Sequence, residues 1–237
     1  MQVILFDVDG TLIRGDGTGR RSLELAFSET FDLCDVGPVT RHVRFSGVLD
    51  PVIHSEMAAA LGLAPALLAE RHEAFMASYL ANLAPACRRD TTGHVLPGVL
   101  DLLDCLQTLP GVHLGLVTGN VEAGARIKLE EFGLNPYFPT GGFGDDGPTR
   151  ATVAHKAATR VAASLPDAVP AEQVVVIGDS ELDVECGRSN GFRTLAVATG
   201  WTSREELAAA RPDHLVDDLS HTEKILSLLI PAEEQPQ

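Results

Sequence analysis

Short apolar runs that alternate with helical patterns constrain the fold of this chain more than any other feature. The runs lie at residues 3–6, 112–118, 174–179 and 194–198, and an amphipathic helical pattern follows each of the last three. Short apolar runs closed by turn residues are typical of buried strands. Strand–helix alternation is typical of a parallel sheet that helices cover on both faces. The sequence therefore predicts an α/β fold.

The segment between the first two runs has a different pattern. Apolar residues recur there at helical spacing in three stretches, residues 21–31, 51–61 and 65–83. The predicted division is an α/β core of residues 1–13 and 95–230, a helical domain of residues 14–94 and a flexible tail of residues 231–237. Because the helical domain leaves and re-enters the core beside the first strand's carboxyl end, we expect it to lie over that end.

Glycine-rich stretches at residues 14–20 and 141–147 are expected to form loops or turns.

The charge of the chain argues against two classes of partner. Its 237 residues include 33 Asp and Glu against 18 Lys and Arg, a formal net charge of −15. Nucleic acids and anionic membranes bind clustered basic residues, so neither is an expected partner. The first strand starts near residue 2, which leaves no room for a signal peptide, so we expect a cytoplasmic protein. Monomer and homodimer both stay open.

Two carboxylates follow the first predicted strand. Asp7 and Asp9 come two residues apart, directly after residues 3–6. Ligands of open α/β sheets bind outside the carboxyl ends of the strands. Two acids at such a point bind a hard cation, act as nucleophile and acid/base, or do both. The structural alternative is an ordinary Asp-Gly turn.

Polar residues also follow the other predicted strands: Thr118, Gly119 and Asn120 after the second, Asp179 and Asp183 at the third, and Arg150 at the start of the helix between these strands. Each has a structural alternative. Asn120 could cap a helix, Asp183 could belong to a capping box, and Arg150 could be a solvated surface charge. Because parallel strands end at one edge of the sheet, we expect these groups to converge there.

The residue types at this edge suit phosphoryl transfer. Asp7 can attack phosphorus and carry an aspartyl-phosphate, and Asp9 can protonate the leaving oxygen and then deprotonate water. Asp7 and Asp179 can hold Mg²⁺, which prefers oxygen ligands. The Thr118 hydroxyl and nearby backbone N–H groups can bind the phosphate oxygens, and the Arg150 guanidinium matches phosphate geometry.

These motifs resemble those of haloacid dehalogenase-superfamily phosphatases of the phosphoglycolate phosphatase type. The resemblance rests on three segments, Asp7-Val8-Asp9-Gly10-Thr11, Thr118 after a buried strand, and Gly178-Asp179-Ser180-Glu181-Leu182-Asp183. It implies a Rossmann-like core with an inserted α-helical cap. It further implies Asp7 as nucleophile, Asp9 as acid/base with a backbone carbonyl that binds Mg²⁺, Asp179 as a metal ligand, and Asp183 as a ligand or a partner of one.

The chain departs from the family in its third motif. Members usually carry Lys followed closely by Pro before a helix, and this chain has no Lys-Pro pair. Arg150 is the expected replacement, because guanidinium forms a two-pronged contact with phosphate. Lys156 is the alternative, although it lies a turn and a half further into the helix. Lys128 is expected to be a solvated helix residue.

The helical domain carries the expected specificity residues. Residues 44–50 resemble the substrate-facing segment of such caps. Arg41, His42 and Arg44 could contact a second anionic group of the substrate, or could be solvated loop charges. The expected partner is a small phosphorylated metabolite, with phosphoglycolate as one candidate.

Other functions on the same residues remain open at this point. A sugar phosphomutase or a pyrophosphatase shares the catalytic residues, and a non-catalytic phosphate-binding module is a more remote alternative because such a module usually loses the nucleophile. A dehalogenase would not need Asp9. A dinucleotide-dependent oxidoreductase is disfavoured because no G-x-G-x-x-G follows the first strand.

Overall fold

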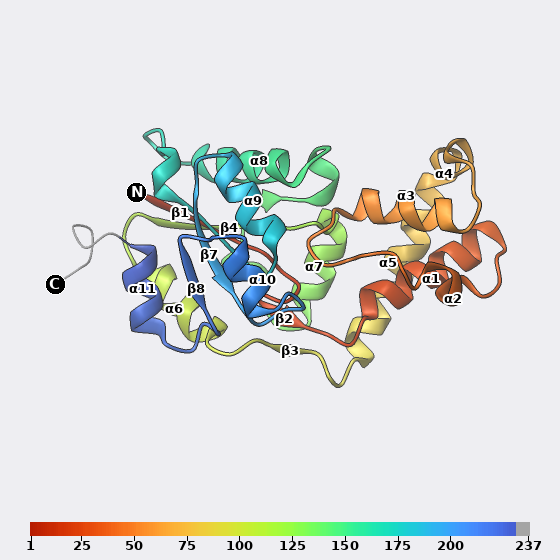
Figure 1. Ribbon diagram of the computed structural model, residues 1–237, viewed down its shortest axis with the longest axis horizontal. Coiled ribbons are helices and arrows are strands. Elements are labelled where there is room, and N and C mark those ends of the chain that lie inside the picture. Colours follow the sequence, from red (N-terminus) through yellow and green to blue (C-terminus); the bar gives the residue numbers. More distant parts are fainter. Residues whose placement is uncertain (231–237) are drawn as a thin grey trace.

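The computed structural model describes residues 1–230, so the tail expected at residues 231–237 lies outside the described residues. A six-stranded parallel sheet forms the core, in the order β5-β4-β1-β6-β7-β8 (Figure 1). Its strands are β1 (Gln2–Phe6), β4 (Val112–Val117), β5 (Gly141–Gly142), β6 (Val174–Gly178), β7 (Arg193–Val197) and β8 (His214–Val216). The predicted α/β fold is therefore confirmed, and the four predicted strands are β1, β4, β6 and β7.

Helices cover both faces of this sheet. They are α6 (Val99–Thr108), α7 (Glu122–Glu130), α8 (Arg150–Ala162), α9 (Glu181–Ser189), α10 (Arg204–Ala209) and α11 (Thr222–Leu229). Ile4 and Phe6 of β1 pack with α6, α7 and α11 on one face, whereas Val3 and Leu5 pack with α8 and α9 on the other. The alternation of side chains along a strand thus feeds two cores from one central strand.

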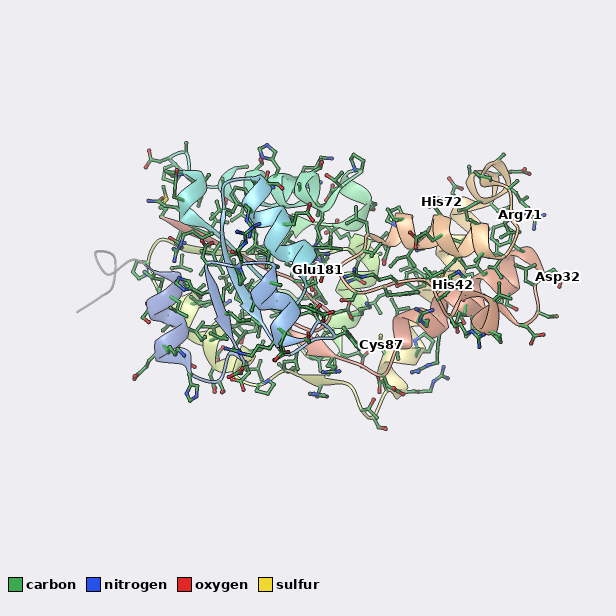
Figure 2. All side chains as sticks on the ribbon, viewed as in Figure 1. Asp32, His42, Arg71, His72, Cys87 and Glu181 are labelled. Atoms are coloured by element: carbon green, nitrogen blue, oxygen red, sulfur yellow. The ribbon has the colours of Figure 1, made fainter. Side chains whose placement is uncertain are left out.

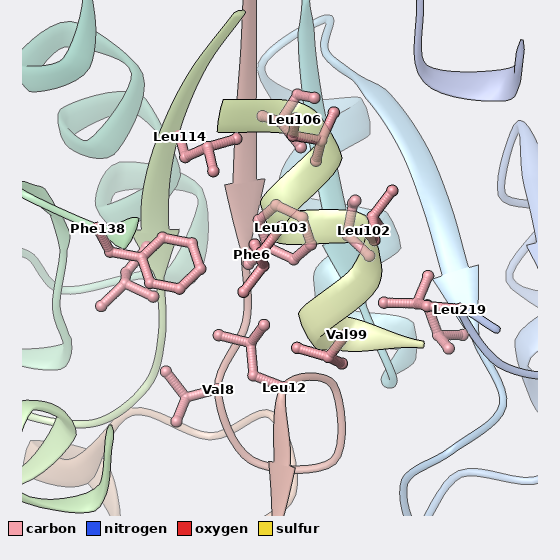
Figure 3. Close-up of a cluster of buried hydrophobic side chains, with 14 of the residues drawn as sticks. Phe6, Val8, Leu12, Val99, Leu102, Leu103, Leu106, Leu114, Phe138 and Leu219 are labelled. Atoms are coloured by element: carbon pink, nitrogen blue, oxygen red, sulfur yellow. The ribbon is translucent and has the colours of Figure 1, made fainter. Parts of the chain in front are cut away.

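The larger core extends directly beneath the loop that follows β1. Val8 and Leu12 of this loop are fully buried against Phe6, Val99 and Phe138 (Figure 3). The backbone N–H of Leu12 donates to the Val8 carbonyl at 3.0 Å, which closes the loop into a tight turn. Apolar side chains on alternate positions therefore anchor the segment that carries the two predicted catalytic acids.

Residues 15–93, which we call the helical unit, lie to one side of the sheet (Figure 1). Its helices are α1 (Thr18–Phe31), α2 (Val36–Thr40), α3 (Asp50–Ala60), α4 (Pro65–Glu70) and α5 (His72–Arg89). They share an apolar cluster in which the rings of Phe27 and Phe75 lie 4.6 Å apart, and Val121 of the core joins this cluster. An antiparallel pair, β2 (Ile13–Arg14) and β3 (His94–Val95), links the unit to the core.

Three local expectations differ from the structure. The helix expected over residues 65–83 is two helices, because Arg71 leaves helical geometry with φ −101° and ψ 12°. Helix α1 begins at Thr18, inside the expected loop of residues 14–20. The turn expected at residues 141–147 contains β5, whose two glycines give no side-chain pattern. A side chain at Gly141 or Gly142 would collide with the backbone of β4 or α8.

Among residues 1–230, no helix has both the length and the apolar composition that crossing a membrane requires.

His54 on α3 makes the stability of the helical unit dependent on pH. It is buried, its ring packs edge-on against Phe75 with centroids 5.0 Å apart, and its Nε2 has no hydrogen-bond partner. Burial, aided by the charge of His72, lowers the pKa of His54 to about 3. In the unfolded chain, where a His pKa is about 6.5, His54 therefore becomes protonated at a pH at which it stays neutral in the folded chain. The unfolding free energy consequently falls as the pH drops below about 6.5.

We expect the unfolding free energy to fall by about 2 kcal/mol more between pH 7 and pH 5 in the natural protein than in His54→Leu. Urea titration of both proteins at the two pH values measures this difference. An equal fall of the unfolding free energy in both proteins would show that His54 is protonated in the folded chain as readily as in the unfolded chain.

Candidate active site

The predicted site residues meet at the carboxyl edge of the sheet. Asp7 follows β1, Thr118 follows β4, Asp179 follows β6 and Arg150 begins α8. A cavity of about 610 Å³ opens here between the sheet edge and the helical unit, and it is lined by Asp7, Thr118 and Arg150 among others. The convergence expected from the strand ends is thus present in the structure.

Arg150 is buried among carboxylates. Its Nη2 donates to Oδ1 of Asp7 at 2.8 Å, and its Nε donates to Oδ1 of Asp183 at 3.0 Å. Its Nη1 donates to the backbone carbonyl of Gly47, in the helical unit, at 3.2 Å. Lys156, the alternative basic residue, is exposed and its ammonium donates to the backbone carbonyl of Asp146. The structure therefore brings Arg150, and not Lys156, to the predicted nucleophile.

Three buried carboxylates form a cluster that suits a metal ion. Oxygen atoms of Asp7, Asp179 and Asp183 all lie within 4.8 Å of one another. Burial raises the pKa of Asp7 to about 7 even though Arg150 opposes this effect, and burial raises the pKa of Asp179 well above its usual range. Oδ2 of Asp179 is buried and has no hydrogen-bond partner. A divalent cation with a preference for oxygen ligands fits this donor set, because it would satisfy that atom and offset the repulsion.

Asp183 differs from the other two members of the cluster. Its Oδ1 accepts from Arg150, and its Oδ2 accepts from the Ser180 hydroxyl at 2.6 Å and from the Ser180 N–H at 3.1 Å. The capping box that the sequence left open is therefore present at the start of α9. Both oxygens of Asp183 already have partners, which favours a role in holding Arg150 over a role as a metal ligand.

Asp9 is held from one side by a hydrogen-bonded network. Its Oδ2 accepts from Lys128 Nζ at 2.6 Å and from Asn120 Nδ2 at 2.7 Å. Lys128 Nζ also donates to Asn120 Oδ1 at 2.7 Å, and Asn120 Nδ2 donates to the Thr118 hydroxyl oxygen at 2.8 Å. Within residues 1–230, no group donates a hydrogen bond to Oδ1 of Asp9, and this residue lines the cavity.

The prediction that Lys128 is a solvated helix residue is wrong. Its side chain is only 11% exposed, and it forms an ion pair with Asp9. Burial alone would lower the pKa of Lys128, but the charges of Asp9 and Asp50 outweigh it and raise the pKa above the usual value. Lys128 lies seven residues after Val121, the buried residue that precedes α7, and this helical spacing was a signal in the sequence that Lys128 lies on the inward face of the helix.

The helical unit contacts the catalytic edge through residues 44–50. The Asp50 N–H donates to the Gly119 carbonyl at 2.7 Å, and Oδ2 of the buried Asp50 accepts from the Val121 N–H at 2.9 Å. Gly119 lies so close to the Val48 carbonyl that a side chain would collide with it. Glycine is therefore required where the unit meets the loop after β4, and Asp50 is a site residue that the sequence reasoning missed.

The cap residues proposed to contact substrate differ in their surroundings. Arg44 lines the cavity, but its Nη2 forms a 2.6 Å ion pair with Glu181 at the start of α9. Arg41 and His42 are exposed, and His42 lies within the helical unit, away from the sheet (Figure 2). Neither of these two lines the cavity. The structure thus places only Arg44 of the three at the site.

Comparisons with known proteins agree with these motifs. The family model of the haloacid dehalogenase-like hydrolases matches residues 4–188. A phosphoglycolate phosphatase of Rhodospirillum rubrum is 30% identical over 224 residues, which cover 92% of this chain and 88% of that protein. The crystal structure of a predicted phosphoglycolate phosphatase from Haemophilus somnus has a similar fold, with a TM-score of 0.70 at 18% identity over 96% of this chain and 98% of that one.

A further similar fold is that of CbbY from Rhodobacter sphaeroides, which was solved in complex with phosphate. Its TM-score is 0.68 at 22% identity, over 93% of this chain and 95% of that chain. The family match spans both the segment with Asp7 and Asp9 and the segment with Asp179 and Asp183. The chain therefore belongs to the haloacid dehalogenase-like hydrolase family.

Proposed function

We propose that the protein is a Mg²⁺-dependent phosphatase that hydrolyses a small phosphomonoester through an aspartyl-phosphate on Asp7. One observation carries the proposal: two acids that are two residues apart have different environments. Asp7 lies in the buried carboxylate cluster beside Arg150, whereas Asp9 faces the cavity and is fixed by Lys128 and Asn120. Membership of a hydrolase family, and a relative named as a phosphoglycolate phosphatase, support this choice.

In the first step Asp7 attacks phosphorus, and the bond from phosphorus to the ester oxygen breaks. Arg150 lies between Asp7 and Asp183 and supplies positive charge to the transferring group. The Thr118 hydroxyl oxygen accepts from the N–H and the side-chain amide of Asn120, so its own proton remains free for a phosphate oxygen. Backbone N–H groups near Gly119 complete the proposed phosphate site.

Asp9 moves the proton in both steps. Lys128 and Asn120 both donate to Oδ2, which leaves Oδ1 as the atom that gives its proton to the leaving oxygen. The same atom then takes a proton from the water that hydrolyses the aspartyl-phosphate. Because Oδ2 is fixed by hydrogen bonds and Oδ1 carries the proton, the carboxyl group is oriented for proton transfer toward the cavity.

Asp7 and Asp179 are the proposed ligands of Mg²⁺, together with the backbone carbonyl of Asp9. When bound, the ion supplies charge that screens the carboxylate nucleophile from the anionic substrate. Asp183 instead orients Arg150. We further propose that residues 14–94 act as a cap domain on a core of residues 1–13 and 95–230, because residues 44–50 reach the catalytic edge.

Arg150→Ala is expected to raise KM and to lower kcat, with kcat/KM reduced by about 10²–10³-fold, because the transferring phosphoryl group loses its cationic partner. Lys156→Ala is the matched control, since Lys156 lies on the same helix and is expected to stay within about twofold of the natural enzyme. Steady-state kinetics of both variants measure this difference. The assignment of Arg150 would be overturned if the two variants exchanged these results.

The proposed function is tested by phosphate release from a panel of phosphomonoesters, with Mg²⁺ and with a chelator. Release that depends on Mg²⁺ is the expected result. Interconversion of sugar phosphates without net phosphate release would indicate a mutase instead, and release from pyrophosphate alone would indicate a pyrophosphatase. No turnover with any of them would contradict an enzymatic function.

A further inference from the structure

The cavity contains more positive charge than the reaction centre uses. Its volume of about 610 Å³ exceeds what a phosphate group fills, and it extends toward the helical unit. The cationic side chains that line it are Arg14, Arg20, Arg44, Lys128 and Arg150. Four of them form ion pairs: Arg20 with Glu24, Arg44 with Glu181, Lys128 with Asp9, and Arg150 with both Asp7 and Asp183.

Arg14 is the exception among the described residues, because no carboxylate lies within ion-pair distance of it. Its Nη1 donates to the Thr199 backbone carbonyl at 2.9 Å, and its guanidinium lies over the indole ring of Trp201, 5.3 Å from the ring centre. Its remaining N–H groups have no hydrogen-bond acceptor in residues 1–230. The chain has a net charge of −15, so an arginine that lines the cavity without an acidic partner is unusual, and it can bind an anionic group there.

Trp201 offers an apolar surface beside this arginine. It is the single tryptophan of the chain, it lines the same cavity, and 54% of it is exposed. The loop that carries it is fixed to the reaction centre, because the Thr199 hydroxyl donates to the Gly10 carbonyl at 2.6 Å. The backbone N–H of Trp201 favours the charged form of Asp179. An indole held in place and half open to a cavity is typical of a binding surface.

We propose that Arg14 and Trp201 form a subsite for the leaving group of the substrate, which rests on the proposed phosphatase function. The ligand class is a phosphomonoester whose leaving group combines a flat or apolar body with a second anionic group. The body packs on the exposed part of the Trp201 indole, and the second anion accepts hydrogen bonds from the free N–H groups of Arg14. The transferred phosphoryl group remains with Thr118 and Arg150.

A matched series of three esters separates the two contributions: ethyl phosphate, phenyl phosphate and 4-carboxyphenyl phosphate. For the natural enzyme, kcat/KM is expected to rise from ethyl phosphate to phenyl phosphate and again to 4-carboxyphenyl phosphate. Arg14→Gln should lower kcat/KM for the carboxylated ester by about tenfold or more, the scale of a charge-assisted hydrogen bond, and leave phenyl phosphate within about twofold. Trp201→Leu should lower kcat/KM for both aromatic esters and leave ethyl phosphate unchanged.

The control variant is Arg21→Gln, because Arg21 is an exposed arginine of the same segment that pairs with Asp16 and does not line the cavity. It should leave the order of the three esters unchanged. Retained hydrolysis of ethyl phosphate shows that each variant is folded. Equal kcat/KM values for the three esters in the natural enzyme, or equal losses on all three in Arg14→Gln, would overturn the subsite.

Tryptophan fluorescence tests the subsite independently of turnover. Because Trp201 is the single tryptophan, binding of 4-hydroxybenzoate, the leaving group without its phosphate, should change the emission of the natural protein and not that of Arg14→Gln. If no ester is hydrolysed and the emission still changes in this way, the phosphatase proposal fails, and Arg14 and Trp201 are a binding site for an aromatic carboxylate but not a leaving-group subsite. If the esters are hydrolysed and the emission does not respond, the subsite is overturned and the phosphatase proposal stands.

Discussion

Asp7→Asn is expected to abolish turnover, with kcat reduced by about 10⁴-fold or more, because an amide cannot act as the nucleophile that a carboxylate is. The fold should survive, since Asn has nearly the same shape. The raised pKa of Asp7 shows that the folded protein disfavours its charge, so a neutral amide should not lower the stability of the metal-free protein. Phosphate release under single-turnover conditions and thermal unfolding without Mg²⁺ measure the two effects.

Asp16→Asn is the matched control for this experiment. Asp16 also lines the cavity, but it is exposed and its carboxylate pairs with Arg21 at 3.5 Å. The same change of charge at the mouth of the cavity should leave kcat within about twofold. Substantial turnover by Asp7→Asn would exclude the aspartyl-phosphate mechanism, whereas equal losses in both variants would point to a general effect of charge in the cavity.

Asp9→Asn is expected to lower kcat by about 10²–10⁴-fold, the scale of general acid–base catalysis. The effect on the first step should shrink for esters with acidic leaving groups, which depart without a proton. Hydrolysis of the aspartyl-phosphate should remain slow for every ester, because the attacking water still needs a base. With 4-nitrophenyl phosphate the variant should therefore release a burst of nitrophenol and accumulate phosphorylated protein.

Rapid-quench measurement of nitrophenol and of acid-stable phosphoprotein tests this expectation. The natural enzyme provides the comparison, because its two steps should both be fast and its phosphoprotein should not accumulate. Equal activity of Asp9→Asn on weak and strong leaving groups, without accumulation, would remove Asp9 from the role of acid and base.

The catalytic edge could be predicted from the sequence because polar residues directly follow the apolar run of each strand. Asp7 and Asp9 directly follow β1, Thr118 follows β4 and Asp179 follows β6, so local patterns and one rule about parallel strands bring them together. The replacement of the family's Lys by Arg150 could also be predicted, since Arg150 stands at the start of a predicted helix, directly after a loop.

The residues that sequence reasoning missed depend on contacts between distant segments. Lys128 reaches Asp9 across 119 residues of sequence, and Asp50 reaches Val121 across 71. No local pattern encodes how closely the helical unit approaches the loop after β4. Both residues also have charged side chains, which usually lie on the surface. The ion pair of Lys128 with Asp9 and the hydrogen bond from the Val121 N–H to Asp50 compensate for taking these charges out of water.

The central position of β1 has a consequence for synthesis of the protein. This strand is synthesised before both of its neighbours, which start at Val112 and Val174. At about 5–20 residues per second, one backbone edge of this apolar strand stays open for roughly ten to thirty seconds, until its second neighbour is made. Nascent chains that stop before β6 therefore expose an open edge of an apolar strand, which is prone to aggregation.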